Sequence, residues 1–299
     1  MLAVPVGDGA RAVLVIDVPR SLSQPHVVDF DGHWRFYARN SVGVFQLDVE
    51  QLRTAFLTGD TEDQRTRELR ATRLASLMAG ELPVRLRSAD MLVVHLVPTS
   101  AWDPSRRVDA GRLGRALDQR LEPIRAGGTR HRHNLDGLLM HTSPDDEGEI
   151  AAYLQLFTSG VIETATADPL TLEKEGERAG LWLPMGAFER WLWESVPSYL
   201  RFQATDLEVD FPVVLMVSLL GAEGARLITR NPFYFLEGHP IDRPNLLFPE
   251  IVIEDPEAPK AEYLRPVFDA LWNAGGYPAG PDIRDDGKLD LGSGYAPLN

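Results

Sequence analysis

The sequence predicts an α+β fold: mixed, mostly antiparallel sheets with flanking helices, in a two-part architecture. Three β-rich segments, over residues 135–142, 151–158 and 161–165, follow one another through short connections rich in turn-forming residues. Connections of this kind join antiparallel neighbours. Strands and helices also succeed one another without strict alternation, which argues against a doubly wound parallel sheet.

The first element is expected to be a strand. Residues 13–18 form an unbroken β-rich run, which predicts a well-buried strand. Pro19 should end it, because proline cannot donate a hydrogen bond to a sheet. Asp31 and Gly32 then predict a tight turn into a second strand over residues 34–39.

Two helices should follow these strands. Asp48 can cap the first helix, with Gln51 three residues later, and Gly59 is expected to end it. Thr61 is expected to cap the second helix, which runs to Gly80. The apolar stripe of that helix should hold Ala71, Leu74, Leu77 and Met78.

The remaining elements belong to the second part of the chain. Strands are expected over residues 91–97, 211–220 and 227–235, and helices over residues 109–121, 185–196 and 267–273. Pro197 should break or kink the helix that it follows. The predicted organisation is a first region of residues 1–82, an α+β domain of residues 83–277 and a mobile tail of residues 278–299.

Composition excludes several classes of function. The chain has no cysteine, which rules out disulfides, thiolate metal sites and a cysteine nucleophile, and makes a cytoplasmic location the default. No glycine-rich phosphate loop occurs, so no cofactor is expected. The longest apolar run, residues 211–222, is too short to cross a bilayer, and no membrane partner is expected.

Charge is divided unevenly along the chain, whose formal net charge is −14. Residues 62–132 hold 14 arginines against 9 acidic residues, whereas residues 133–299 hold 11 basic residues against 28 acidic ones. An acidic surface repels phosphate backbones. Nucleic acid, if it binds, is therefore expected to bind the first half.

A family resemblance rests on four segments in order: VLVIDVPRS, QPH, WRFYARN and DVEQLRTAF. Over about 45 residues they resemble the C-terminal half of the Schlafen/AlbA-type DNA-binding domain of bacterial proteins. Four later segments resemble the region that follows this domain in such proteins: VVHLVP, HNLDGLL, YLQLFTSGVIE and PVFDALWNAGG. The resemblance implies an α+β fold and contact with DNA or RNA.

The resemblance does not imply a reaction. In nuclease members related to Schlafen, acidic residues of the first half of the domain hold a metal and cleave RNA, and those positions precede the matched segment. We therefore expect a non-catalytic nucleic-acid-binding protein. The alternatives are a protein-interaction or regulatory module, or a truncated metal-dependent nuclease. A half-domain would leave a strand edge near residues 13–18, which a homo-oligomer or a partner chain could cover.

The candidate binding residues are basic or aromatic and lie in the first half. Arg35, Tyr37 and Arg39 should share one strand face, where guanidiniums suit phosphates and the ring suits a base. The alternative is an ordinary solvated sheet face with a cation–π pair. The full predicted set is Arg20, His26, Arg35, Tyr37, Arg39, Arg67, Arg70 and Arg73.

The histidines are predicted to hold no metal. His131 and His133 form an H-x-H pair that could bind a cation with His141 or Asp145, but neighbouring arginines oppose this. His95, within an apolar strand, is expected to be a hydrogen-bonded core histidine rather than a catalytic one.

Overall fold

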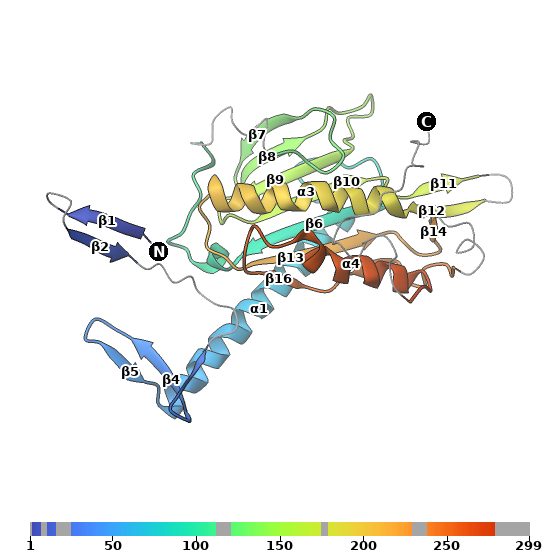
Figure 1. Ribbon diagram of the computed structural model, residues 1–299. Coiled ribbons are helices and arrows are strands. Elements are labelled where there is room, and N and C mark those ends of the chain that lie inside the picture. Colours follow the sequence, from blue (N-terminus) through green and yellow to red (C-terminus); the bar gives the residue numbers. More distant parts are fainter. Residues whose placement is uncertain are drawn as a thin grey trace.

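The computed structural model describes residues 2–6, 11–15, 25–111, 121–174, 179–228 and 238–278. Within these ranges helices and antiparallel sheets coexist, which confirms the α+β class (Figure 1). The predicted helix over residues 109–121, the predicted strand over residues 227–235 and the predicted tail over residues 278–299 lie mostly outside the described residues, and Arg20 lies outside them.

A large sheet forms the centre of the molecule, and all its strand pairs are antiparallel. Its strand order is β15-β13-β6-β10-β9-β8-β7, and β16 lies beside β13. The strands are β6 (Met91–Pro98), β7 (Arg130–Asn134), β8 (Gly137–His141), β9 (Ala152–Phe157), β10 (Ile162–Ala167), β13 (Val213–Leu220), β15 (Asn245–Leu247) and β16 (Ile251–Ile253).

Helices cover both faces of this sheet, because its central strands are apolar on both sides. On β6, Leu92, Val94 and Leu96 pack into the core shared with α3 (Met185–Thr205) and α4 (Lys260–Ala274). Alternate residues of β6, among them Met91 and Val93, pack with the last turns of α1 (Val49–Met78) on the other face. The result is three layers with the sheet in the middle (Figure 1).

Two smaller sheets and a hairpin complete the structure. One sheet has the order β11-β12-β14, made of β11 (Thr171–Glu173), β12 (Gly180–Pro184) and β14 (Arg226–Ile228). The other has the order β3-β4-β5, made of β3 (Val27–Phe30), β4 (His33–Arg39) and β5 (Val44–Gln46). The hairpin pairs β1 (Leu2–Val6) with β2 (Arg11–Val15), and a short 3-10 helix, η1, covers Thr99–Trp102.

The sequence predicts a well-buried strand over residues 13–18, but Val13 and Leu14, which the structure places in β2, are exposed, and residues 16–18 lie outside the described residues. β2 pairs only with β1 among the described strands, and the side chains of Val13 and Leu14 are 54% and 56% exposed. A two-stranded ribbon has no second layer against which to bury its side chains, whatever their composition. The Asp31–Gly32 turn is confirmed: both residues have positive φ angles, as a two-residue hairpin turn requires.

The two helices predicted around Gly59 are one continuous helix, α1. The Asp48 cap is confirmed, with Gln51 completing a capping box. Thr61 does not cap a second helix, because its hydroxyl donates to the carbonyl of Leu57 within the same helix. Ala71 and Met78 are exposed, and Arg73 lies on the inward side of the helix with Leu74 and Leu77.

Pro197 does not end α3 either, because the helix runs on to Thr205. A proline inside a helix leaves the carbonyl four residues earlier without its usual donor. Here that carbonyl belongs to Trp193, and the Nζ of Lys260 on α4 donates to it at 3.2 Å. A side chain from the neighbouring helix therefore replaces the missing backbone hydrogen bond.

Candidate functional site

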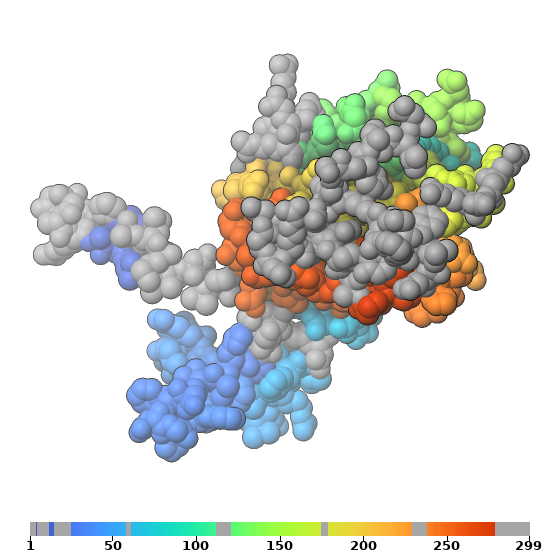
Figure 2. Space-filling model, turned by 45° about the vertical axis from the view of Figure 1, so that its right-hand side comes forward, coloured from blue at the N-terminus to red at the C-terminus, as the bar shows by residue number. Residues whose placement is uncertain are grey.

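The open face of the β3–β4–β5 sheet carries the residues that the sequence singles out. Phe36 and Ala38 of β4 are half-buried, and the Phe36 ring meets Phe56 of α1 edge-on at 6.2 Å between centroids. Since neighbouring residues of a strand point to opposite faces, Arg35, Tyr37 and Arg39 lie on the face away from α1. Figure 2 shows this part of the chain, in blue, standing out from the body.

Cross-strand partners extend this face beyond β4. Val28 lies opposite Arg35, and Phe30 lies opposite His33, so both pairs share the face. A hollow of about 140 Å³ opens there, lined by Val28, Phe30, Asp31, His33, Arg35 and Tyr37. We call the residues Val28, Phe30, His33, Arg35, Tyr37 and Arg39 the β4 face.

Two guanidiniums of the β4 face have no partner among the described residues. Within the described part of the chain, neither Arg35 nor Arg39 forms an ion pair, and both are exposed. Asp31 supplies the one carboxylate among the residues that line the hollow. The His33 Nδ1–H donates to the carbonyl of Asp31 at 2.9 Å, which leaves Nε2 able to accept a hydrogen bond. The face therefore offers donors for an anion and two aromatic rings.

The three arginines of α1 that belong to the predicted binding set have partners inside the molecule. Arg67 and Arg70 both pair with Glu250, at 3.0 and 2.8 Å, and Arg73 pairs with Glu163. The structure thus does not bring these three together with Arg35 and Arg39 on one free surface. Their sequence spacing is that of a basic helix face, but the acidic partners lie on distant segments, and only the tertiary fold reveals them.

Glu163 is the centre of a buried polar cluster beneath α1. Its side chain is fully buried, and Arg73 holds both carboxylate oxygens, from Nε at 2.8 Å and Nη2 at 2.7 Å. His95 Nε2 lies 2.9 Å from Oε2, and the Tyr153 hydroxyl donates to Oε1 at 2.7 Å. The prediction that His95 is a hydrogen-bonded core histidine is confirmed. We call Arg73, His95, Tyr153 and Glu163 the Glu163 cluster.

Sheet register explains why these residues meet. His95 of β6 lies directly opposite Glu163 of β10, and Tyr153 of β9 is a diagonal neighbour of Glu163 on the same face. Arg73 comes down from α1, and its guanidinium also lies 5.3 Å from the centroid of the Phe157 ring. The cluster is therefore assembled from three neighbouring strands and the helix that covers them.

The charge of Glu163 is stabilised despite its burial. Burial alone would raise the pKa of the carboxyl, but hydrogen bonds from Arg73 and His95, with their charges, outweigh it and bring the pKa to about 2. The hydrogen bond to Glu163 raises the pKa of Arg73. Burial, together with the neighbouring carboxylate, raises the pKa of Tyr153 well above its usual value. Glu163 and Arg73 therefore stay charged under α1, the Tyr153 hydroxyl stays neutral, and the buried ion pair is suited to anchoring the helix.

The roles of Glu163, Tyr153 and Glu250 are not predicted from the sequence. A faint signal exists for Glu163, because it is a carboxylate within the otherwise uncharged strand IETATA. A charge in such a strand needs a partner, and a buried histidine on another strand is one candidate. The inward position of Arg73 could not be predicted from the sequence, because an arginine beside an apolar stripe is ordinarily expected on the solvated flank of a helix.

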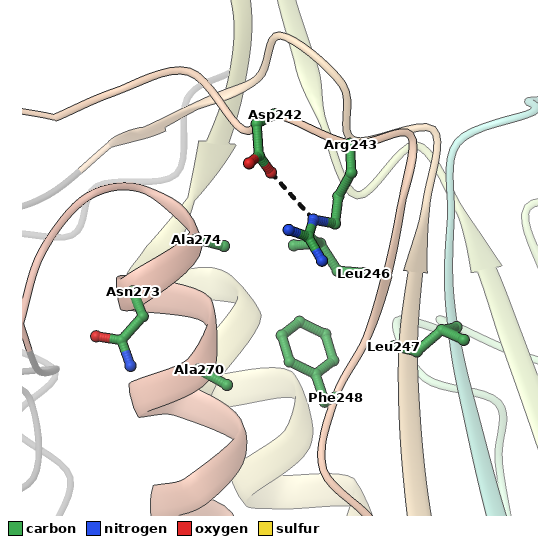
Figure 3. Close-up of a pocket in the computed structure, with 8 residues that line it drawn as sticks. All are labelled: Asp242, Arg243, Leu246, Leu247, Phe248, Ala270, Asn273 and Ala274. Atoms are coloured by element: carbon green, nitrogen blue, oxygen red, sulfur yellow. Dashed lines mark hydrogen bonds and ion pairs between the residues drawn. The ribbon is translucent and has the colours of Figure 1, made fainter.

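Other hollows present fewer free polar or charged groups. One of about 340 Å³ lies between α4 and β15, where Leu246 and Phe248 are beside Ala270 and Ala274 (Figure 3). Its charged groups, Asp242 and Arg243, pair with each other at 3.0 Å. Because neighbouring residues satisfy each other there, the hollow presents no free charge.

A second hollow, of about 350 Å³, lies beside α3. In it Arg125 sits 4.5 Å from the centroid of the Trp191 ring and donates to the carbonyls of Ala167 and Asp168. Its guanidinium is thus already held by the protein.

Three histidines outside the core that the sequence singles out lie at exposed positions. His26 is exposed directly before β3, while His131 and His133 lie exposed on one face of β7. Within the described ranges, no three histidine or acidic side chains are grouped as a metal would need.

No described helix combines the length and the apolar character needed to cross a bilayer. No family model, curated protein or solved structure matches this chain.

Proposed function

We propose that the chain binds single-stranded nucleic acid through the β4 face. The observation that carries this proposal is the pair Arg35 and Arg39, which lie on either side of the Tyr37 ring and form no ion pair with any residue that the structure describes. Every other arginine of the first-half set that the structure describes, namely Arg67, Arg70 and Arg73, is held by a carboxylate of the chain.

The chemistry of the β4 face suits a flexible strand. Arg35 and Arg39 can each hold a phosphate through a charge-assisted hydrogen bond. Phe30 and Tyr37 are 79% and 41% exposed and offer ring faces on which unpaired bases can stack. Stacking of this kind contributes about 1–3 kcal/mol per base and tolerates any sequence. A duplex hides its base faces, so we expect the single strand to bind more tightly.

The proposal does not include cleavage. Asp31 is the single carboxylate lining the hollow, and a metal-dependent nuclease needs several oxygen ligands together. The role of the β4 face is therefore binding, in which phosphates and bases are held and no bond is broken.

Fluorescence anisotropy with a short labelled oligothymidine and its RNA counterpart tests the proposal. The wild-type chain should bind both at about 50 mM salt and lose affinity by about 200 mM, because phosphate contacts release counterions. The double variant Arg35→Ala/Arg39→Ala should lose most of the binding. It should also reduce the salt slope by about 1.4, at roughly 0.7 per phosphate contact on a single strand.

A charge-matched control separates the β4 face from general basicity. Arg53 and Arg65 are exposed on α1 and form no ion pair in the described part of the chain. The variant Arg53→Ala/Arg65→Ala removes the same charge and should bind like the wild type. Equal losses in the two double variants, or no binding at low salt, would contradict the proposal.

A second candidate function is protein interaction, and the exposed apolar side chains around the small sheet favour it. Trp34 is 75% exposed, Val44 is 66% exposed and Val49 is 78% exposed. Exposed apolar patches mark interaction surfaces. Absence of nucleic-acid binding, together with a molar mass by light scattering that rises with protein concentration, would favour this function over the first.

A further inference from the structure

Among the strands that the structure describes, β16 is an edge strand of the large sheet. It pairs with β13 on one side, and no described strand pairs with its other side. A groove of about 420 Å³ runs along this open side, between β16 and the start of α4. Val252 of β16 is 50% exposed, and Tyr263 of α4 forms a buried wall. An open strand edge beside a groove can accept an extended backbone.

The rim of the groove is uniformly acidic. Glu254, Asp255 and Glu262 line it, and no basic residue does. Neither Glu254 nor Glu262 pairs with a cation in the described ranges. Two nearby cations are engaged elsewhere, because Lys260 donates to the carbonyl of Trp193 and Arg201 lies 3.8 Å from Glu257.

We propose that this groove binds an extended peptide segment that alternates basic and apolar residues, as an added strand along β16. The backbone of the segment would pair with the open edge of β16. In a strand, successive side chains point to opposite faces. Basic side chains on the face toward α4 would meet Glu262 and, just beyond the end of β16, Glu254, and apolar side chains on the other face would cover Val252.

Charge complementarity favours this occupant over the alternatives. Nucleic acid would be repelled by three carboxylates, and an acidic peptide would be repelled equally. A purely apolar segment would leave the carboxylates without partners. The site is independent of the β4 face, which lies on the small N-terminal sheet.

Binding of a labelled synthetic peptide that alternates arginine and valine tests the proposal. Fluorescence anisotropy should show binding to the wild-type chain that weakens with salt. The variant Glu254→Gln/Glu262→Gln should weaken it by about tenfold. The control variant Glu147→Gln/Glu223→Gln removes two exposed carboxylates outside the groove and should leave the affinity unchanged.

Two further peptides test the mode of binding. A peptide with glutamate in place of arginine should not bind, and a peptide with methylated alternate backbone nitrogens should not bind either, because it cannot donate to β16. Equal losses in both double variants, tight binding of the methylated peptide, or no binding of the arginine peptide at low salt would overturn the proposal. Self-association of the chain that Glu254→Gln/Glu262→Gln abolishes, without peptide binding, would replace the peptide by a second copy.

Discussion

At the scale of single residues, Arg73 is the most consequential side chain of α1. Its guanidinium neutralises Glu163, which has no contact with solvent. Removing one partner of a buried ion pair leaves the other charged and unpaired. The chain therefore depends on Arg73 for the stability of the sheet, and not only for the position of α1.

The variant Arg73→Ala should destabilise the chain by about 3–5 kcal/mol at pH 7, because it leaves the buried Glu163 carboxylate without its guanidinium partner. In the wild type, the lowered pKa of Glu163, about 2, contributes stability above its ordinary pKa. That contribution is lost as the pH falls from about 4.5 towards 2. Urea denaturation at pH 7 and pH 3 should show the cost of Arg73→Ala shrinking at pH 3, where Glu163 in the variant becomes neutral.

The variant Arg65→Ala serves as the control, since Arg65 is exposed on the same helix. It should cost less than about 0.5 kcal/mol at either pH. A cost of Arg73→Ala that equals the control, or that grows at pH 3, would contradict the electrostatic role of the Glu163 cluster.

The sequence predicts these residues only in part. His95 could be assigned to the core because its neighbours, VV before it and LVP after it, are apolar. Its partner could not be assigned, because pairing of β6 with β10 joins segments 68 residues apart along the chain. The ion pairs of Arg67 and Arg70 with Glu250 could not be predicted for the same reason, because Glu250 lies 183 and 180 residues away along the sequence.

At the scale of elements, α1 links the small sheet to the large one. Its first turns pack against β4 through Phe56, and its last turns pack against the large sheet through Leu74 and Leu77. A glycine inside a helix costs only about 1 kcal/mol, which packing at both ends can offset. Gly59 therefore does not divide the helix, although local sequence alone predicts that it does.

The N-cap of α1 fixes where the helix leaves the small sheet. Asp48 accepts from the Gln51 backbone N–H at 2.8 Å, and the Gln51 side chain accepts from the Asp48 backbone N–H at 3.1 Å. The variant Asp48→Ala should cost about 1 kcal/mol in free energy of unfolding, measured by urea denaturation. Asp48→Asn retains an oxygen acceptor and should cost much less, so equal costs would show that the cap is not responsible.

At the scale of the whole molecule, the architecture was largely predictable and the connections between its parts were not. Alternation and turn residues identify the hairpins of β8, β9 and β10, because strand pairing across a short turn is local. The sequence does not predict that β2 is exposed, that α1 is one continuous helix or that α3 runs on past Pro197. Each of these features depends on which other elements pack against the segment. Those contacts are decided by the tertiary structure.

The two proposed binding surfaces lie on different sheets. The β4 face projects from the body on a sheet that α1 covers on one side only, whereas the β16 groove belongs to the large sheet (Figure 1). A small sheet with one covered face opens locally at low free energy, so its amides exchange at measurable rates. Ligand contact at the β4 face should therefore be directly visible in hydrogen exchange.

Hydrogen–deuterium exchange with and without an oligothymidine tests the central claim most directly. Peptides covering β3, β4 and β5 should exchange more slowly when the oligonucleotide is bound, and this protection should vanish in Arg35→Ala/Arg39→Ala. Peptides covering residues 62–78 and the β16 groove should be unchanged. Protection confined to residues outside 27–46, or unaltered exchange at saturating oligonucleotide, would contradict the account.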